Sequence, residues 1–148
     1  MRKAIAIALA IALWPAVAGA QSVKSVLEEF GLLRGSWAPD CSNGPSTSNW
    51  HGRYRMMPNG EARLTYSSKK SSSGENVYLI RLARRLSDKE ILLAEEFVRE
   101  KRALEVVLSV EGDRYHTISV KRADGSYLVK DGKYADGDEE SPWLERCR

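Results

Sequence analysis

The histidines and cysteines of this sequence, which most often catalyse reactions or bind zinc, are few and lie far apart. Among its 148 residues are two histidines, His51 and His116, and two cysteines. The cysteines are about 100 residues apart and the histidines are distant from each other, which does not match the compact spacing of a zinc site. No G-x-S-x-G motif is present to supply a serine nucleophile. We therefore expect a protein that is not an enzyme and that holds neither a metal nor a cofactor.

Acidic residues cluster near the C-terminus, where a calcium site would need a defined pattern. A calcium-binding EF-hand loop requires glycine at its sixth position and glutamate at its twelfth. Counted from Asp136, those positions hold Ser141 and Cys147. The cluster is therefore interpreted as a solvated turn. Its members are Asp136, Asp138, Glu139 and Glu140.

The two cysteines, Cys41 and Cys147, are expected to form one structural disulfide. Lone cysteine pairs in exported proteins most often do so, whereas a redox site would usually carry a C-x-x-C motif. Closing a loop of about 100 residues stabilises the fold by about 4–5 kcal/mol in the chain-entropy model. Two free thiols or a redox pair are the alternatives.

One histidine and several large apolar side chains fall on the apolar faces of expected strands. Alternation places His116 on the same face as Ile118 and Val120. A hydrogen-bonded histidine in a barrel wall is the favoured interpretation, against a metal or haem ligand. The side chains that are candidates to line a ligand cavity, rather than to fill a packed core, are Tyr54, Met56, Tyr66 and His116.

The first 20 residues have the three parts of a secretory signal peptide. Arg2 and Lys3 precede an apolar run over residues 4–13, and Ala18-Gly19-Ala20 forms a small-residue cleavage site. The run is about half of the roughly 20 residues that span a bilayer. We expect cleavage between Ala20 and Gln21, no membrane span, and a periplasmic or secreted product whose residues 21–148 form one domain.

The charge of the expected mature chain gives no sign of a nucleic-acid partner. Removing residues 1–20 leaves 21 basic and 20 acidic side chains. Nucleic-acid binding would require a clustered basic face.

The remaining chain has the pattern of one short helix followed by a β-meander. Residues 22–30 predict a helix with Ser22 as its cap. Turn pairs such as Asn59-Gly60 and Asp124-Gly125 recur mostly every 11–14 residues, between segments in which apolar and polar residues alternate. Residues 88–105 also contain a helix-capping pattern, but strands are favoured there because a helix would interrupt the hairpin spacing. The predicted fold is all-β, a single up-and-down β-barrel or strongly curved antiparallel sheet of about eight strands.

Two resemblances accompany this pattern. The segment Leu32-Leu33-Arg34-Gly35-Ser36-Trp37 resembles the start of lipocalin-like (calycin-like) barrels, where a short helix precedes G-x-W. The resemblance implies that Gly35 allows close backbone approach and that Trp37 closes one end of the barrel. The terminal P-W-L-x-x-C, residues 142–147, resembles small uncharacterised exported proteobacterial proteins, for which no activity is implied.

An eight-stranded barrel either is filled by side chains or holds one small ligand. The leading hypothesis is a non-catalytic periplasmic module that binds a small apolar ligand or an envelope protein. The alternative is a periplasmic protease inhibitor of the small β-barrel type. A deep internal cavity would favour the binding module, whereas a filled core with an extended, exposed N-terminus would favour the inhibitor.

Overall fold

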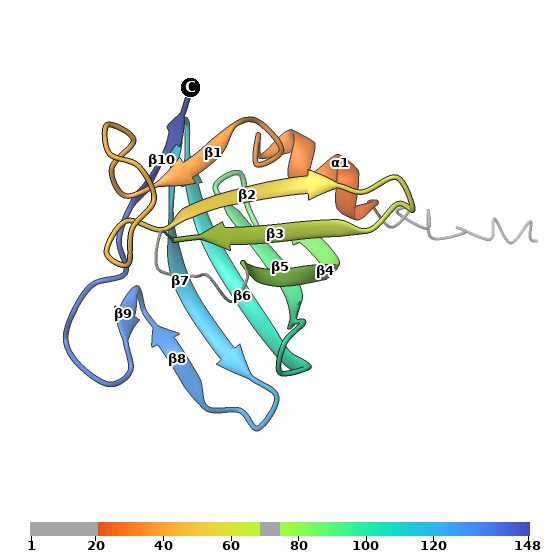
Figure 1. Cartoon of the computed structure of the whole chain (residues 1–148). Coiled ribbons are helices and arrows are strands. Elements are labelled where there is room, and N and C mark those ends of the chain that lie inside the picture. Colours follow the sequence, from red (N-terminus) through yellow and green to blue (C-terminus); the bar gives the residue numbers. More distant parts are fainter. Residues whose placement is uncertain (1–20, 69–74) are drawn as a thin grey trace, which may run out of the picture.

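The computed structural model describes residues 21–68 and 75–148, and these form a closed β-barrel with one short helix (Figure 1). The barrel consists of eight antiparallel strands, β1 to β7 and β10, because β10 pairs with both β1 and β7. Two further strands, β8 and β9, extend the sheet beyond β7. The predicted all-β barrel is therefore confirmed. The strand bounds are β1 Ser36–Ala38, β2 His51–Met56, β3 Ala62–Ser67, β4 Asn76–Arg85, β5 Glu90–Phe97, β6 Arg102–Glu111, β7 Arg114–Arg122, β8 Tyr127–Lys130, β9 Lys133–Tyr134 and β10 Leu144–Cys147.

The segment that could have been helix or strand, residues 88–105, belongs to the hairpin β5–β6. Ser87 does act as a cap, since its hydroxyl accepts hydrogen bonds from the backbone N–H groups of Lys89 and Glu90. The turn that it caps leads into a strand, however, because β5 alternates strictly between buried and half-buried residues. Period-two burial in a barrel wall therefore outweighs local helix propensity.

The helix α1, Val23–Glu29, covers one end of the barrel (Figure 1). Ser22 caps it by accepting a hydrogen bond from the N–H of Ser25, as its position in the sequence predicts. Val26 and Leu27 are fully buried against the barrel. Glu29 forms an ion pair with Arg85 at the end of β4, at 3.1 Å, which places the helix beside the β4–β5 turn.

The barrel closes along the seam between β1 and β10. Ser36 pairs with Cys147 across this seam, and the predicted disulfide joins Cys147 to Cys41 with a Cα–Cα distance of 5.2 Å. Gly35 lies beside it with a φ of +72°, and a Cβ there would lie 2.7 Å from the carbonyl oxygen of Cys147. The close approach of the two strands thus requires glycine at this position.

A β-bulge in β7 changes which side chains face the interior. Thr117 pairs with Leu108 and Ser119 pairs with Val107, so Ile118 has no partner on β6. The extra residue instead accepts a hydrogen bond from the N–H of Gly132. Alternation is interrupted at such a bulge, and the residues before it face opposite to expectation.

The expected location of the signal peptide, residues 1–20 with its cleavage site after Ala20, lies outside the described residues. Within the described part of the chain, the only helix is too short and too polar to cross a membrane.

Candidate ligand-binding site

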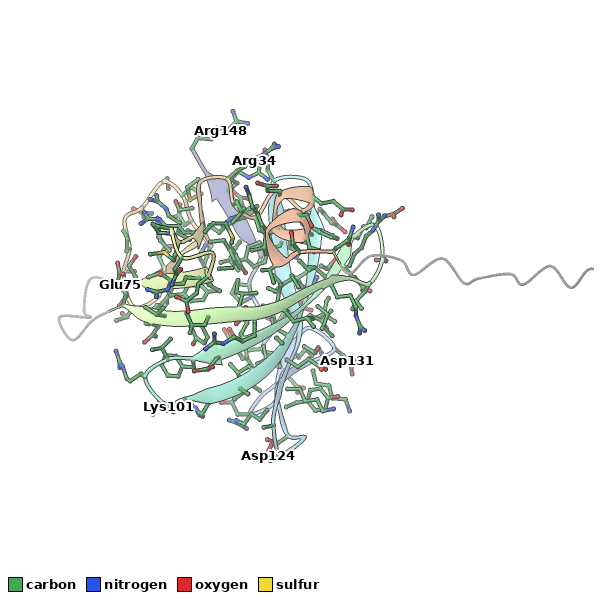
Figure 2. The ribbon with its side chains drawn as sticks, turned by 90° about the vertical axis from the view of Figure 1, so that its right-hand side faces the viewer. Arg34, Glu75, Lys101, Asp124, Asp131 and Arg148 are labelled. Carbon is green, nitrogen blue, oxygen red and sulfur yellow. A yellow bond between two sulfur atoms is a disulfide. The ribbon has the colours of Figure 1, made fainter. Side chains whose placement is uncertain are left out.

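An open cavity of about 1030 Å³ lies between the inner wall of the barrel, the β8–β9 extension and two flanking loop segments, and none of the residues that line it belongs to α1. Its walls come from β2 to β10, and its rim includes residues of the 39–50 loop and of the 135–142 segment. Figure 2 shows the two ends, with Arg34 and Arg148 at the helix-covered end and Lys101 and Asp124 at the other. Apolar side chains make up much of the wall: Leu64, Leu104, Val106, Leu108, Val120, Val129 and Leu144.

Two groups of aromatic rings occupy different depths of the barrel. Towards the helix-covered end, the fully buried Trp37 packs against Tyr115 with 5.0 Å between ring centroids, and Tyr115 meets Tyr54 edge-on at 6.4 Å. Nearer the open end, Tyr78 stands perpendicular to Tyr66 at 6.0 Å and stacks on Phe97 at 5.0 Å. Of the first group only Tyr54 reaches the cavity, whereas Tyr66 and Tyr78 of the second group both line it.

A single carboxylate lies among these rings on the inner wall. Glu95 is only 6 % exposed and lines the cavity. Its neighbours across the sheet are apolar, Ile80 on β4 and Leu104 on β6. Burial raises the pKa of Glu95 to about 7. Among the described residues, no hydrogen bond or ion pair reaches its carboxylate, and its oxygens are open to the cavity although the residue as a whole is buried.

The tyrosines near Glu95 form a polar patch in an otherwise apolar interior. Burial raises the pKa of Tyr54, Tyr66, Tyr78 and Tyr115, and the carboxylate of Glu95 adds to the increase for all four. The hydroxyl of Tyr115 is buried next to those of Tyr54 and Tyr66, which influence its pKa, but it makes no hydrogen bond of good geometry within the described ranges. Unpaired buried polar groups cost free energy unless something supplies their hydrogen bonds. The patch therefore has the chemistry of a ligand-binding surface.

The rim of the cavity is predominantly acidic. Three of the four clustered acidic residues of the sequence, Asp136, Glu139 and Glu140, contribute to it. Arg122 is the one basic side chain among the described lining residues. The cluster interpreted from sequence as a solvated turn thus also borders the mouth of the cavity.

A second, smaller groove of about 270 Å³ lies on the other face of β2 and β3 and has a different character. Its lining includes His51, Arg53 and Arg55 of β2, and Glu75. The two arginines are exposed, so water solvates them already. The groove lacks the buried, unpartnered groups that distinguish the interior cavity.

Of the four residues proposed to line a cavity, two do so and two do not. Tyr54 and Tyr66 are among the lining residues. Met56 has the same orientation but lies nearer the helix-covered end, where it packs against the core. His116 was expected on the apolar face, but the bulge at Ile118 reverses its orientation, and its ring stacks on Trp143 at 4.1 Å instead.

The residues implied by the lipocalin-like resemblance lie together near the helix-covered end. The indole N–H of Trp37 donates to the carbonyl oxygen of Leu32 at 3.2 Å. The guanidinium carbon of Arg146 lies 5.0 Å from the centre of the Trp37 ring, and Arg146 also pairs with Asp113 at 2.8 Å.

Sequence reasoning missed Glu95, although a signal for it was present. Residues 91, 93, 95 and 97 share one face of β5, and three of them are Ile, Leu and Phe. A glutamate at the remaining apolar position breaks the pattern and marks an inward-facing charge. Net charge alone, considered without alternation, does not single out Glu95.

No three His, Cys, Asp or Glu side chains group into a metal site within residues 21–68 and 75–148. No protein-family model matches the sequence, and neither curated proteins nor solved structures gave a significant match.

Proposed function

We propose that this chain is an exported, non-catalytic binding protein that holds one small, mainly apolar ligand inside its barrel. The observation that carries the proposal is the cavity of about 1030 Å³ between apolar walls. Sites for small molecules commonly enclose about 300–1,000 Å³ and combine apolar walls with a few polar groups. Here the tyrosines and Glu95 are the polar groups.

Export is supported by the signal-peptide pattern of residues 1–20 and by the disulfide, which persists in oxidising compartments. These two features support a periplasmic or secreted location. The lipocalin-like interpretation is supported by the backbone conformation of Gly35 and by the complete burial of Trp37.

The alternative function, protease inhibition, has less support. An inhibitor of this kind would present an extended N-terminal segment to the protease. Residues 23–29 instead form α1, and two of its apolar side chains are buried in the core.

The proposal is tested by titrating the purified protein with N-phenyl-1-naphthylamine, a neutral apolar fluorophore. Leu104→Trp places a large side chain in the cavity, and Ala103→Trp places the same side chain on the exposed face of β6 as a control. We expect the wild type and Ala103→Trp to bind the probe alike, and Leu104→Trp to bind at least several-fold more weakly. Equal binding by both variants, or no binding by the wild type, would contradict an interior site.

A further inference from the structure

We propose that the ligand is an organic cation, an apolar amine whose ammonium group binds to the carboxylate of Glu95 inside the cavity. This inference rests on the proposed binding function and specifies the chemistry of its ligand. It is carried by a carboxylate that is 94 % buried, lines the cavity and has no partner in the described chain.

The first argument is the position of the carboxylate. A buried carboxylate is normally paired, because desolvation of an isolated charge is costly. The side chains opposite Glu95, Ile80 and Leu104, provide neither charge nor hydrogen bonds. An ammonium group in the cavity would supply both the countercharge and the hydrogen-bond donors that the protein omits.

The second argument is the set of rings around the carboxylate. The tyrosines that sense its charge lie on four strands: Tyr54 on β2, Tyr66 on β3, Tyr78 on β4 and Tyr115 on β7. Aromatic faces attract cations, and this attraction increases when the cation is desolvated. Phenol oxygens also accept hydrogen bonds from an ammonium group. These rings therefore suit a cation better than a second anion.

The third argument is the charge of the whole cavity. Among the described lining residues, Glu95, Asp136, Glu139 and Glu140 are acidic, and Arg122 alone is basic. Like charges lining one cleft raise the local concentration of ligands of opposite sign. The rim therefore attracts cations and repels fatty acids and other anions.

The titration of Glu95 makes this recognition depend on pH. Inside the barrel Glu95 faces the four tyrosines, Ile80 and Leu104, and none of them carries a charge near neutral pH. The charged residues that share the cavity with it are Arg122, Asp136, Glu139 and Glu140. The pKa of about 7 means that the carboxylate ionises across the neutral range. Affinity for an amine therefore rises between about pH 6 and about pH 8, where the amine itself stays protonated.

The test compares three eight-carbon probes that differ only in their polar group: octylamine, octan-1-ol and octanoate. Binding is measured by calorimetry at about pH 8 for the wild type, Glu95→Gln and Glu96→Gln. Glu96 lies on the face of β5 opposite to Glu95 and forms an ion pair with the exposed Arg81. The substitution Glu96→Gln therefore removes a nearby charge outside the cavity. Thermal unfolding confirms that each variant is folded.

We expect the wild type to bind octylamine at least about tenfold more tightly than octan-1-ol, and octanoate most weakly. Glu95→Gln should lose that advantage while binding octan-1-ol unchanged, and Glu96→Gln should behave as the wild type. If octan-1-ol or octanoate binds the wild type as tightly as octylamine, or if Glu95→Gln keeps full affinity for octylamine, the amine inference is wrong and the apolar site stands. If no probe binds, both proposals are wrong.

Discussion

The two ends of the barrel both contain aromatic side chains, but these pack closely at one end and surround a cavity at the other. At the helix-covered end, Trp37 is fully buried, its indole N–H is bonded to the Leu32 carbonyl, and Tyr115 and Arg146 cover its ring. At the other end, tyrosines and Glu95 surround a cavity, and the carboxylate has no partner in the described chain. Aromatic rings fill the interior at one end and leave an open cavity at the other.

The difference indicates how stability and binding are divided in this fold. Close packing with paired polar groups stabilises the native state. A buried charge without a partner destabilises it, and such groups concentrate at functional sites. Substitutions at the closed end should therefore reduce stability and leave ligand binding intact. Substitutions at Glu95 should instead increase stability near neutral pH and weaken ligand binding.

The largest effect is expected at the seam. Replacing both Cys41 and Cys147 with Ala should lower the free energy of unfolding by about 4–5 kcal/mol, because the disulfide closes a loop of about 100 residues in the unfolded chain. Thermal unfolding and probe titration on the same variant provide the measurement. Affinity of the folded fraction should not change. A loss of stability below about 1 kcal/mol together with lost binding would instead point to a functional disulfide.

The next largest loss of stability is expected for Trp37, the buried side chain of the helix-covered end. Trp37→Ala should cost about 3–5 kcal/mol, since it removes a fully buried aromatic side chain and leaves a cavity. Trp50→Ala is the matched control, because Trp50 is half-buried and lines the open cavity. Urea unfolding should show a change of less than about 1 kcal/mol for the control. If both variants lost the same stability, the contrast between the two ends would fail.

The smallest effect is expected at Glu95, where the substitution should raise the free energy of unfolding instead of lowering it. The pKa of Glu95 is raised from 4.5 to about 7 in the folded state, so the native protein binds a proton that the unfolded chain has released. The stability associated with protonated Glu95 is present below about pH 4.5 and is lost as the pH rises through about 7. Between about pH 5 and about pH 8.5, the wild type should therefore lose about 2–3 kcal/mol relative to Glu95→Gln.

Urea unfolding of the wild type and Glu95→Gln over this pH range measures the difference. Glu96→Gln controls for removal of any carboxylate from β5 and should follow the wild type. Parallel curves for wild type and Glu95→Gln would mean that Glu95 ionises as easily in the folded state as in water.

Local patterns in the sequence were sufficient to predict most of the fold. Turn pairs and alternation predicted the hairpins, Ser22 marked the start of the helix, and the lone cysteine pair indicated the disulfide. These features depend on neighbours in the chain or on residue type. They do not require knowledge of which distant strands pair.

The candidate site was harder to predict because it depends on depth and on irregularities. Alternation assigns a side chain to a face, so Tyr54 and Met56 looked equivalent although only Tyr54 reaches the cavity. The bulge at Ile118 inserts one residue, and its partner Gly132 is remote in the chain, so the outward orientation of His116 left no periodic signal.

The position of β10 between β1 and β7 also governs how the barrel is assembled during folding. The first seven strands form a meander of sequential hairpins, but closure needs β10 to pair with β1, which lies about 100 residues earlier. Contacts of such long range form slowly. Until then β1 and the N-terminal half of β7, which pairs with β10 in the closed barrel, are unpaired edges, and edges of this kind accept strands from other chains. A folding chain that receives β10 from a second copy would produce an exchanged dimer with the same seam, and slow closure would favour it at high protein concentration.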